Sequence, residues 1–248
     1  MQPDLPFTHF APASDEQSRG TLLLVYGGSG KPNFRHKTRL LAEPIALLGF
    51  RVIAFDYRSN TEGANFYAFG IHDRIEDTKR AIEHMKVLGE PPFSILGLSM
   101  GGHIAVRAVA ETDDGNLFEN VILIAPAAYP EEATKPGVLF GREPGMLQSI
   151  IKQPDGKAWL TTDAFRSAEK INANLLVVKY LEDKIIPRDV PGLYYRSFGS
   201  TLKKSSKWHK KIIDLPGEHQ GTLTDPKRIG LLVEEIDSFT AIMATAAR

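Results

Sequence analysis

The sequence has no cysteine, no excess of either charge and no long hydrophobic run. The absence of cysteine among 248 residues excludes disulfides, thiolate metal sites and a cysteine nucleophile. Thirty basic residues balance thirty acidic ones, so the overall charge does not indicate a nucleic acid partner. No window approaches about 18 consecutive apolar residues, and the N-terminal stretch lacks the pattern of a signal peptide. We therefore expect a soluble, cytoplasmic protein with no stable membrane insertion.

Apolar runs rich in leucine and β-branched residues recur at wide spacing along the chain. They are continuous rather than alternating, which is typical of strands buried on both faces of a parallel sheet. The runs are 21–26, 51–57, 93–98, 121–126, 174–180 and 211–216. One short strand is also expected at residues 7–11, ahead of these runs.

Segments with helical spacing of apolar residues lie between and after these runs. In the segment 71–89, charged residues lie opposite an apolar face, and Gly89 is placed to end the helix. Asp225 and Pro226 form an N-cap pair at the start of the last helix. The two apolar faces consist of Ile71, Ile75, Ile82 and Met85, and of Ile229, Leu232, Ile236 and Phe239. This alternation predicts a doubly wound, mostly parallel α/β sheet of about six to eight strands.

One long interval, residues 127–171, departs from this alternation. It contains scattered proline and glycine and short apolar pieces instead of a single helix. A connection of this length inside a compact domain is usually functional, and ligands of open α/β folds bind at the carboxyl edge of the sheet. We therefore predict one domain over residues 1–248, with residues 127–171 inserted as a small helical cap over that edge.

The motif GLSMGG, residues 97–102, lies between a predicted strand and a predicted helix. Gly97 and Gly101 flank Ser99 at two residues to either side, where a Cβ would collide in a turn tight enough to expose the hydroxyl. The pattern alone is a weak signal, since a glycine-rich turn can hold an unreactive serine. Its position between strand and helix favours a nucleophile. His103, on the same helix, is expected to pack beneath this turn or to face the side.

A serine nucleophile needs a base, and the base needs an acid that orients it. Asp183 and His219 each lie just beyond one of the last two predicted strands. Glu182 is the alternative acid, because adjacent residues of an extended segment point in opposite directions and only one carboxylate can face His219. We expect Ser99, the acid and the base to meet at one edge of the sheet.

The order Ser99, Asp183, His219 and the motifs GLSMGG, EDKIIP and GEH resemble those of serine hydrolases of the α/β-hydrolase superfamily, over about residues 21–245. The resemblance implies that Ser99 attacks an acyl carbonyl, that His219 transfers protons and that Asp183 orients the imidazole. The offset of Asp183 from Pro187 resembles the family pattern and favours it over the neighbouring glutamate.

The segment VYGGSG, which follows the first strong strand, resembles the oxyanion loop of the same superfamily. The resemblance implies an oxyanion hole formed by the backbone N–H groups of Gly28 and Met100. The start of a helix offers such free N–H groups, which agrees with the position of Met100. The family often has histidine where this chain has Tyr26, so we expect the support of the loop to differ.

The cap interval and a basic segment give two weaker indications of the substrate. Five apolar residues of the cap could line an acyl pocket or form the core of the cap itself: Phe140, Met146, Leu147, Ile150 and Trp159. Residues 203–211 gather five lysines around Trp208. This segment could bind an anion such as a coenzyme A ester, or a membrane surface, but a solvated edge is the favoured interpretation.

The combined signals predict a serine hydrolase that needs no metal and no cofactor. Its expected substrate is a small-molecule carboxylic ester or thioester, cleaved through an acyl-enzyme intermediate. An amidase or aminopeptidase remains open, because Glu131, Glu132 or Glu143 could receive a substrate amine. An acyltransferase on the same residues and a non-catalytic ligand-binding relative also remain open.

Overall fold

A single sheet of seven strands organises the part of the chain that the structure describes. The computed structural model describes residues 5–12, 18–28, 35, 37–112, 116–141, 157–201, 208–219 and 223–246. The strands are β1 (Phe7–Phe10), β2 (Thr21–Val25), β3 (Arg51–Phe55), β4 (Phe93–Leu98), β5 (Phe118–Ile124), β6 (Asn174–Tyr180) and β7 (Lys210–Leu215). Their order is β1-β3-β2-β4-β5-β6-β7. β1 is antiparallel to β3, and every other pairing is parallel, which confirms the predicted fold class.

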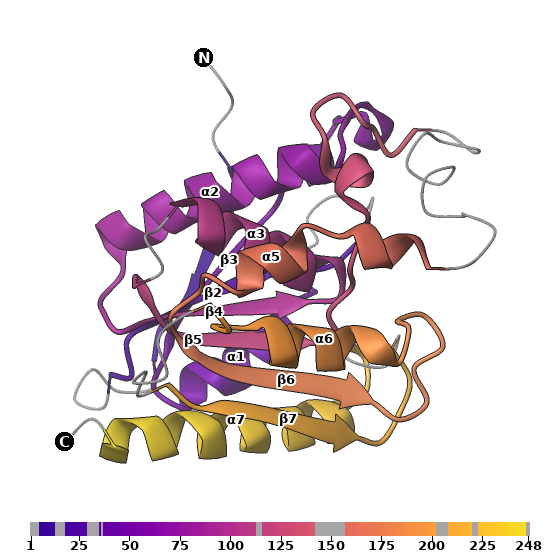
Figure 1. The fold of residues 1–248 in the computed structure, drawn as a ribbon. Helices are drawn as coiled ribbons and strands as arrows, with labels where there is room; N and C mark the ends of the chain where they lie inside the picture. The colour runs from indigo at the N-terminus through magenta and orange to yellow at the C-terminus, as the bar shows by residue number, and fades with distance from the viewer. Residues whose placement is uncertain are drawn as a thin grey trace.

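Helices cover both faces of the sheet. The α-helices are α1 (Arg39–Leu47), α2 (Ile71–Leu88), α3 (Met100–Thr112), α5 (Ala164–Ala168), α6 (Asp189–Ser197) and α7 (Pro226–Ala246). The helices α1 and α7 contact each other on one face, while α2, α3, α5 and α6 form a contiguous layer on the other (Figure 1). Among the described residues, no helix combines the length and the apolar character needed to cross a membrane.

The core lies on both sides of the central strands, which explains their continuous apolar sequences. Every residue of β2 is buried, as are all but the first residues of β3 and β4. The residues predicted to face the core from α2 and α7 are buried: Ile71, Ile75, Ile82, Met85, Ile229, Leu232, Ile236 and Phe239. Each such side chain stabilises the fold by about 1.5–3 kcal/mol relative to an exposed position.

The carboxyl ends of β2 to β7 meet at one edge of the sheet, because these strands all run in the same direction. In Figure 1 this edge lies to the right, where the arrowheads of β5, β6 and β7 point. Loops that follow parallel strands therefore bring distant parts of the sequence together here. In open α/β folds, ligands bind at this edge.

The described part of the interval 127–171 contains three short helices, of which α5 packs against α3 and α6. They are η5 (Glu131–Thr134), η6 (Ala158–Thr161) and α5. Residues 142–156 lie outside the described residues. We retain as a proposal that residues 1–248 form one domain and that residues 127–171 are an insertion within it.

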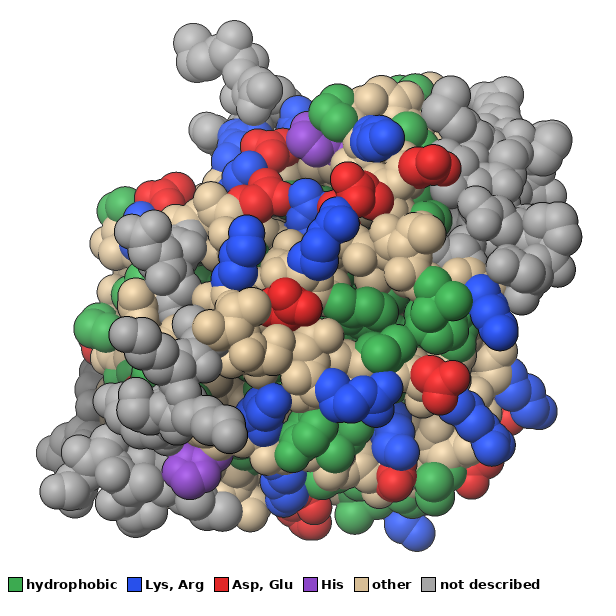
Figure 2. Space-filling view, in the orientation of Figure 1, with side chains coloured by type: hydrophobic (Ala, Val, Ile, Leu, Met, Phe, Trp, Pro, Cys, Tyr) green, Lys and Arg blue, Asp and Glu red, His purple; other side chains and the backbone are tan. Residues whose placement is uncertain are grey.

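The surface carries both signs of charge close together. On the face shown in Figure 2, lysine and arginine side chains are interspersed with aspartate and glutamate. Exposed ion pairs such as Arg39 with Glu43 and Lys86 with Glu83 belong to this pattern. Each contributes little to stability, because water and salt screen the attraction.

Candidate active site

Ser99 occupies a strained turn between β4 and α3. Its φ is 57°, a left-handed conformation that residues other than glycine rarely adopt. The turn is held from both sides, since the Ser99 N–H donates to the carbonyl of Ile124 and the Ser99 carbonyl accepts from Gly102 and Ala127, each at 2.9 Å. This conformation raises the side chain out of the strand and toward the carboxyl edge of the sheet.

The glycines around Ser99 are required by close packing. A Cβ on Gly97 would lie 2.6 Å from the Gly101 carbonyl oxygen, and a Cβ on Gly101 would collide with the carbonyl oxygens of Val25 and Tyr26. The start of α3 is therefore pressed against the end of β2. Since real Cβ atoms do not approach other atoms this closely, the structure explains why the motif needs glycine at both positions.

His219 lies between Ser99 and Asp183 at the sheet edge. Its Nε2 is 2.8 Å from the Ser99 Oγ, and its Nδ1 is 2.9 Å from Oδ2 of Asp183. The side chains of His219 and Asp183 are 13% and 8% exposed. An ionised carboxylate only accepts hydrogen bonds, so Nδ1 carries the proton and Nε2 is left to accept from the serine hydroxyl.

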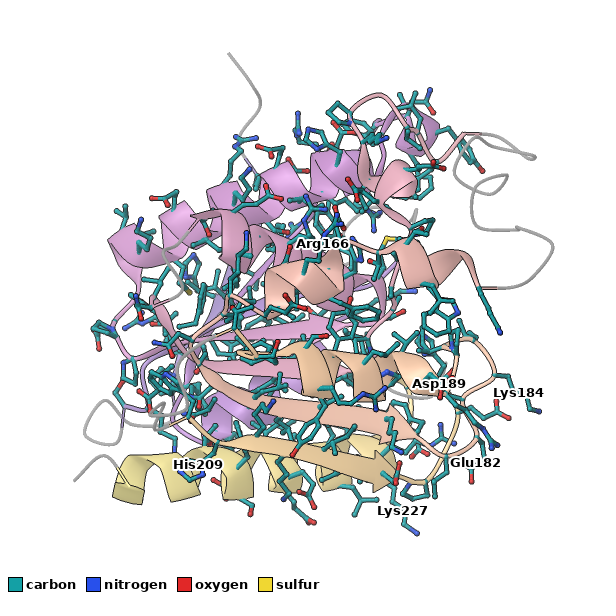
Figure 3. The ribbon with its side chains drawn as sticks, in the orientation of Figure 1. Arg166, Glu182, Lys184, Asp189, His209 and Lys227 are labelled. Carbon is teal, nitrogen blue, oxygen red and sulfur yellow. The ribbon has the colours of Figure 1, made fainter. Side chains whose placement is uncertain are left out.

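The loop after β6 holds the two adjacent carboxylates in different places. Oδ1 of Asp183 accepts the N–H groups of Ile185 and Ile186 at 2.8 and 2.9 Å, which leaves Oδ2 for the imidazole. Glu182, which is labelled in Figure 3, instead accepts the backbone N–H of Gly217, on the loop that follows β7. Of the two acids that the sequence left open, the structure therefore brings Asp183 to the histidine, and Glu182 joins the two loops.

The described part of the predicted oxyanion loop, residues 26–28, packs against Ser99. A Cβ on Gly27 would lie 2.9 Å from the Ser99 Cβ, and a Cβ on Gly28 would lie 3.3 Å from Cε of Met100. Gly28 thus lies against the end of the Met100 side chain, and its neighbour Gly27 lies against Ser99. That the N–H groups of Gly28 and Met100 form an oxyanion hole stays a prediction.

Tyr26 supports the loop where related enzymes often have histidine. Its hydroxyl donates to Oδ1 of Asp56 at 3.2 Å, and its carbonyl accepts from the Tyr57 hydroxyl at 3.1 Å. Burial raises the pKa of Tyr26 and of Tyr57, so both phenols keep the protons that they donate. Two tyrosines therefore support this loop, which is the expected difference from the family pattern.

Arg74 is a residue near the site that the sequence analysis missed. It is 0% exposed, and its Nη1 donates to the carbonyl of Gly27 at 3.1 Å. Arg74 lies on the buried face of α2 between Ile71 and Ile75 in helical spacing. A charged residue within an apolar stripe is the signal that could have identified it.

The proposed substrate residues are only partly described. Phe140 is 6% exposed and stacks on Phe66 with ring centroids 4.6 Å apart, so it belongs to the apolar core. Trp159 is half-buried and packs against the same core. Met146, Leu147 and Ile150 lie outside the described residues. Whether these five side chains receive a substrate stays a prediction.

The described end of the basic segment makes structural contacts. Nζ of Lys210 donates to the carbonyl oxygens of Tyr195 and Phe198 at 2.9 and 3.1 Å, where α6 ends. Lys211 forms an ion pair with Glu235 of α7 at 2.7 Å. A lysine near a helix C-terminus satisfies carbonyls that lack a partner in the helix. Residues 203–207 lie outside the described residues, so the interpretation of this segment stays a prediction.

The described residues offer no obvious metal centre, since no three of their histidine, aspartate and glutamate side chains cluster in a way that could hold an ion. A seven-stranded sheet with helices on both faces, and a serine raised at the end of its fourth strand, define the class of protein: an α/β-hydrolase.

Comparison with known proteins identifies the family. The family model described as serine aminopeptidase, S33, matches residues 16–154. That is more than half of the chain, so the chain belongs to this family and is a hydrolase. The search of curated proteins gives no match.

Several solved structures share the fold. Est1E from Butyrivibrio proteoclasticus, with ferulic acid bound, has a TM-score of 0.72 and 17% identity, over 98% of this chain and 96% of Est1E. The monoacylglycerol lipase of Paleococcus ferrophilus has a TM-score of 0.64 and 18% identity, over 96% and 98% of the two chains. The esterase Est2 of Thermogutta terrifontis has a TM-score of 0.67 and 18% identity, over 97% and 88%.

Proposed function

We propose that the protein hydrolyses small-molecule carboxylic esters or thioesters with Ser99, His219 and Asp183 as its catalytic triad. The observation that carries the proposal is the position of the imidazole, 2.8 Å from the serine Oγ on one side and 2.9 Å from the Asp183 carboxylate on the other. Such an arrangement is what an acyl-transfer mechanism requires, since the hydroxyl is unreactive without a base.

The first half of the proposed reaction acylates the serine. Nε2 of His219 accepts the hydroxyl proton of Ser99 while Oγ bonds to the carbonyl carbon, and the carbonyl oxygen becomes an oxyanion. The N–H groups of Gly28 and Met100 donate to that oxyanion. The intermediate then expels the alcohol or thiol, which takes the proton from the imidazolium. An acyl group remains on Oγ.

The second half releases the acid. Water loses a proton to Nε2 of His219 and its oxygen attacks the acyl carbon, giving a second oxyanion in the same place. Collapse of that intermediate breaks the bond to Oγ, and the serine regains the proton from the imidazolium. Asp183 keeps the ring in one orientation and stabilises its positive charge throughout.

Two observations bear on the choice between esters and amides. The structural neighbours include an esterase with ferulic acid bound and a monoacylglycerol lipase, although at 17–18% identity they carry only an analogy. An aminopeptidase needs a free carboxylate for the substrate ammonium group. Glu131 is already paired with Arg166 on the surface, whereas Glu132 is exposed and keeps this role open. The family description keeps the amide alternative in view, with Glu143 outside the described residues.

The proposal is tested by labelling with a fluorophosphonate probe, followed by rates on p-nitrophenyl esters, acyl thioesters and amino acid p-nitroanilides of graded size. We expect labelling and ester turnover in the wild type. Ser99→Ala should abolish labelling, and both Ser99→Ala and His219→Ala should lower kcat by about 10⁴-fold or more. Undiminished labelling of Ser99→Ala would refute the assignment of the nucleophile.

The adjacent acids supply a matched pair of variants for the same experiment. Asp183→Asn should lower kcat by about 10³- to 10⁴-fold, because the amide can hold the imidazole in the wrong tautomer. Glu182→Gln keeps an oxygen that can accept from Gly217, so its kcat should stay within about threefold of the wild type. The reverse ranking would assign the acid to Glu182.

A further inference from the structure

Arg74 connects α2 to both segments that carry the proposed oxyanion donors. Its side chain is fully buried. Nη1 donates to the Gly27 carbonyl at 3.1 Å and lies 3.7 Å from Sδ of Met100. Nη2 donates to Oδ1 of Asn60, in η3 (Arg58–Asn60), at 2.9 Å. The planar guanidinium is therefore held at two nitrogen atoms and cannot rotate away from the loop without losing a bond.

The carbonyl that Arg74 binds and the N–H that would bind the oxyanion belong to the same peptide unit. The bond between Gly27 and Gly28 is trans, and in a planar trans peptide the C=O and N–H bonds point in opposite directions. A donor that holds the Gly27 oxygen toward α2 therefore turns the Gly28 N–H away from α2. Gly27 packs against the Cβ and Oγ of Ser99, so the peptide that Arg74 holds lies directly beside the proposed nucleophile.

We propose that Arg74 is a positioning residue that orients and polarises the Gly27–Gly28 peptide, so that the Gly28 N–H is a stronger and better aligned donor to the oxyanion. The inference rests on the proposed function, since the oxyanion forms only when Ser99 attacks an acyl carbonyl. A cationic donor makes a stronger hydrogen bond than a neutral one, and bonds in a chain polarise one another. Arg74 acts through the peptide and not on the reacting atoms.

The charge of Arg74 is costly at this position, which argues that it has a function. Burial lowers the pKa of the guanidinium because the charged form loses its hydration. Three aromatic rings partly replace the water: the guanidinium carbon lies 4.5, 4.9 and 5.5 Å from the ring centroids of Tyr57, Phe140 and Phe66. A methionine would fill the same space in the apolar stripe without that cost.

The test compares the wild type with Arg74→Met and Arg74→Lys on a p-nitrophenyl ester and on the thionoester that has sulfur in place of the carbonyl oxygen. Loss of one oxyanion donor typically lowers kcat by about 10²- to 10³-fold. Weakening a donor should cost less, so we expect Arg74→Met to lower kcat on the ester by about 10- to 100-fold, with KM within about twofold. Arg74→Lys keeps the positive charge but lacks the planar guanidinium that donates from two nitrogen atoms. Its kcat on the ester should therefore lie between those of the wild type and Arg74→Met.

The ratio of ester to thionoester rates separates this role from a merely structural one. Sulfur is a weak hydrogen-bond acceptor, so a weaker oxyanion donor slows the ester more than the thionoester and lowers the ratio. Arg107→Met is the matched control, because Arg107 is a partly buried arginine whose described contacts are with Glu111, Thr134 and Asp163. It should leave the ratio unchanged.

Each outcome supports or overturns the proposal. If Arg74→Met does not fold, as judged by circular dichroism, Arg74→Lys carries the measurement. An unchanged ratio in the folded variant, whether or not kcat falls, or a loss confined to KM, would overturn the role of Arg74. A failure of the proposed function is distinguishable, because it shows in the wild type as absence of both fluorophosphonate labelling and ester turnover, and it would overturn this inference as well.

Discussion

His103 is a buried imidazole on α3, one turn beyond Ser99. Its Nδ1 accepts the backbone N–H of Tyr129 at 3.3 Å, and its Nε2 lies 4.0 Å from Oδ1 of Asp163. Burial, and then the positive charge of Arg107, lower the pKa of His103 to about 3. The structure thus has His103 fully buried beside Tyr129 and Asp163, where it stays neutral at physiological pH.

This buried histidine predicts a loss of stability in acid. The unfolded chain binds a proton at an ordinary pKa of 6.5, whereas the folded chain resists protonation of His103 until about pH 3. The free energy of unfolding should therefore fall by up to about 1.4 kcal/mol for each pH unit between these values, and be fully retained above pH 6.5. Urea unfolding from pH 7.5 to 4.5 measures the slope.

The control for this prediction is His103→Asn, whose amide oxygen can still accept the N–H of Tyr129 but does not titrate. The variant loses volume and should be less stable at pH 7.5, yet its acid slope should be flatter than that of the wild type. Parallel slopes in the two proteins would show that His103 does not cause the acid sensitivity.

The β4–α3 turn is the element on which the site depends. Its backbone conformation, its glycines and its contact with β2 are coupled, because Ser99 keeps a left-handed φ only while the start of α3 is pressed against the end of β2. A glycine at position 101, in the first turn of α3, loses more backbone entropy on folding than an alanine would. The need for close packing of α3 against β2 therefore outweighs the low helix propensity of glycine at this position.

Substitution of alanine for glycine should change the stability of the protein in opposite directions at two helical positions. Gly101→Ala places a methyl group against the carbonyl oxygens of Val25 and Tyr26 and should destabilise the protein by about 2 kcal/mol or more, with loss of ester turnover. Gly230→Ala, on the exposed side of α7, meets no atom within 4 Å and should stabilise it by about 0.5–1 kcal/mol. Thermal denaturation of both variants measures the difference.

The control is built into this pair, since both substitutions make the same chemical change within a helix. Equal shifts of the melting temperature would mean that the packing around Gly101 relaxes freely. That result would remove the argument that close contact between α3 and β2 maintains the turn.

At the scale of the whole molecule, one apolar core runs through the described residues from Leu5 near the N-terminus to Phe239 in α7. It includes Ala164 and Ala168 of α5, inside the proposed insertion, together with β5 and β6 on either side of it. A core that is shared in this way predicts that the insertion and the sheet lose their structure together.

We therefore predict a single unfolding transition. Far-ultraviolet circular dichroism, which follows the sheet and helices, should coincide with near-ultraviolet circular dichroism and with the fluorescence of Trp159 and Trp208 across a urea titration. Two separated transitions, with the fluorescence change preceding the loss of secondary structure, would contradict the proposal of one domain with an integral insertion.

The ends of the strands show how far sequence patterns determine the fold. The predicted strands 93–98 and 174–180 match β4 and β6, because their apolar runs end at a glycine-rich turn and at charged residues. The predicted strand 121–126 only partly overlaps β5 (Phe118–Ile124). β5 ends at Ile124 because the backbone turns at Ala125, whose φ is 43°. An apolar run records burial, whereas the last residue of a strand depends on hydrogen bonds to its neighbours.

The candidate site was predictable where each residue follows a strand end. Ser99, Asp183 and His219 could be named because parallel strands bring their carboxyl ends to one edge. The choice between Glu182 and Asp183 needed side-chain directions, since both carboxylates are present in the same loop. The amino-acid sequence of the loop does not determine these side-chain directions.

The sequence by itself determined the alternation of strands and helices, the glycines of the turn and the order of the three candidate catalytic residues, because each depends on local spacing and burial. Only the tertiary structure decided that Arg74 binds the carbonyl of Gly27, 47 residues away along the chain. That contact depends on how α2 lies against the end of β2. The packing of two elements against each other fixes such distances, and no local pattern contains them.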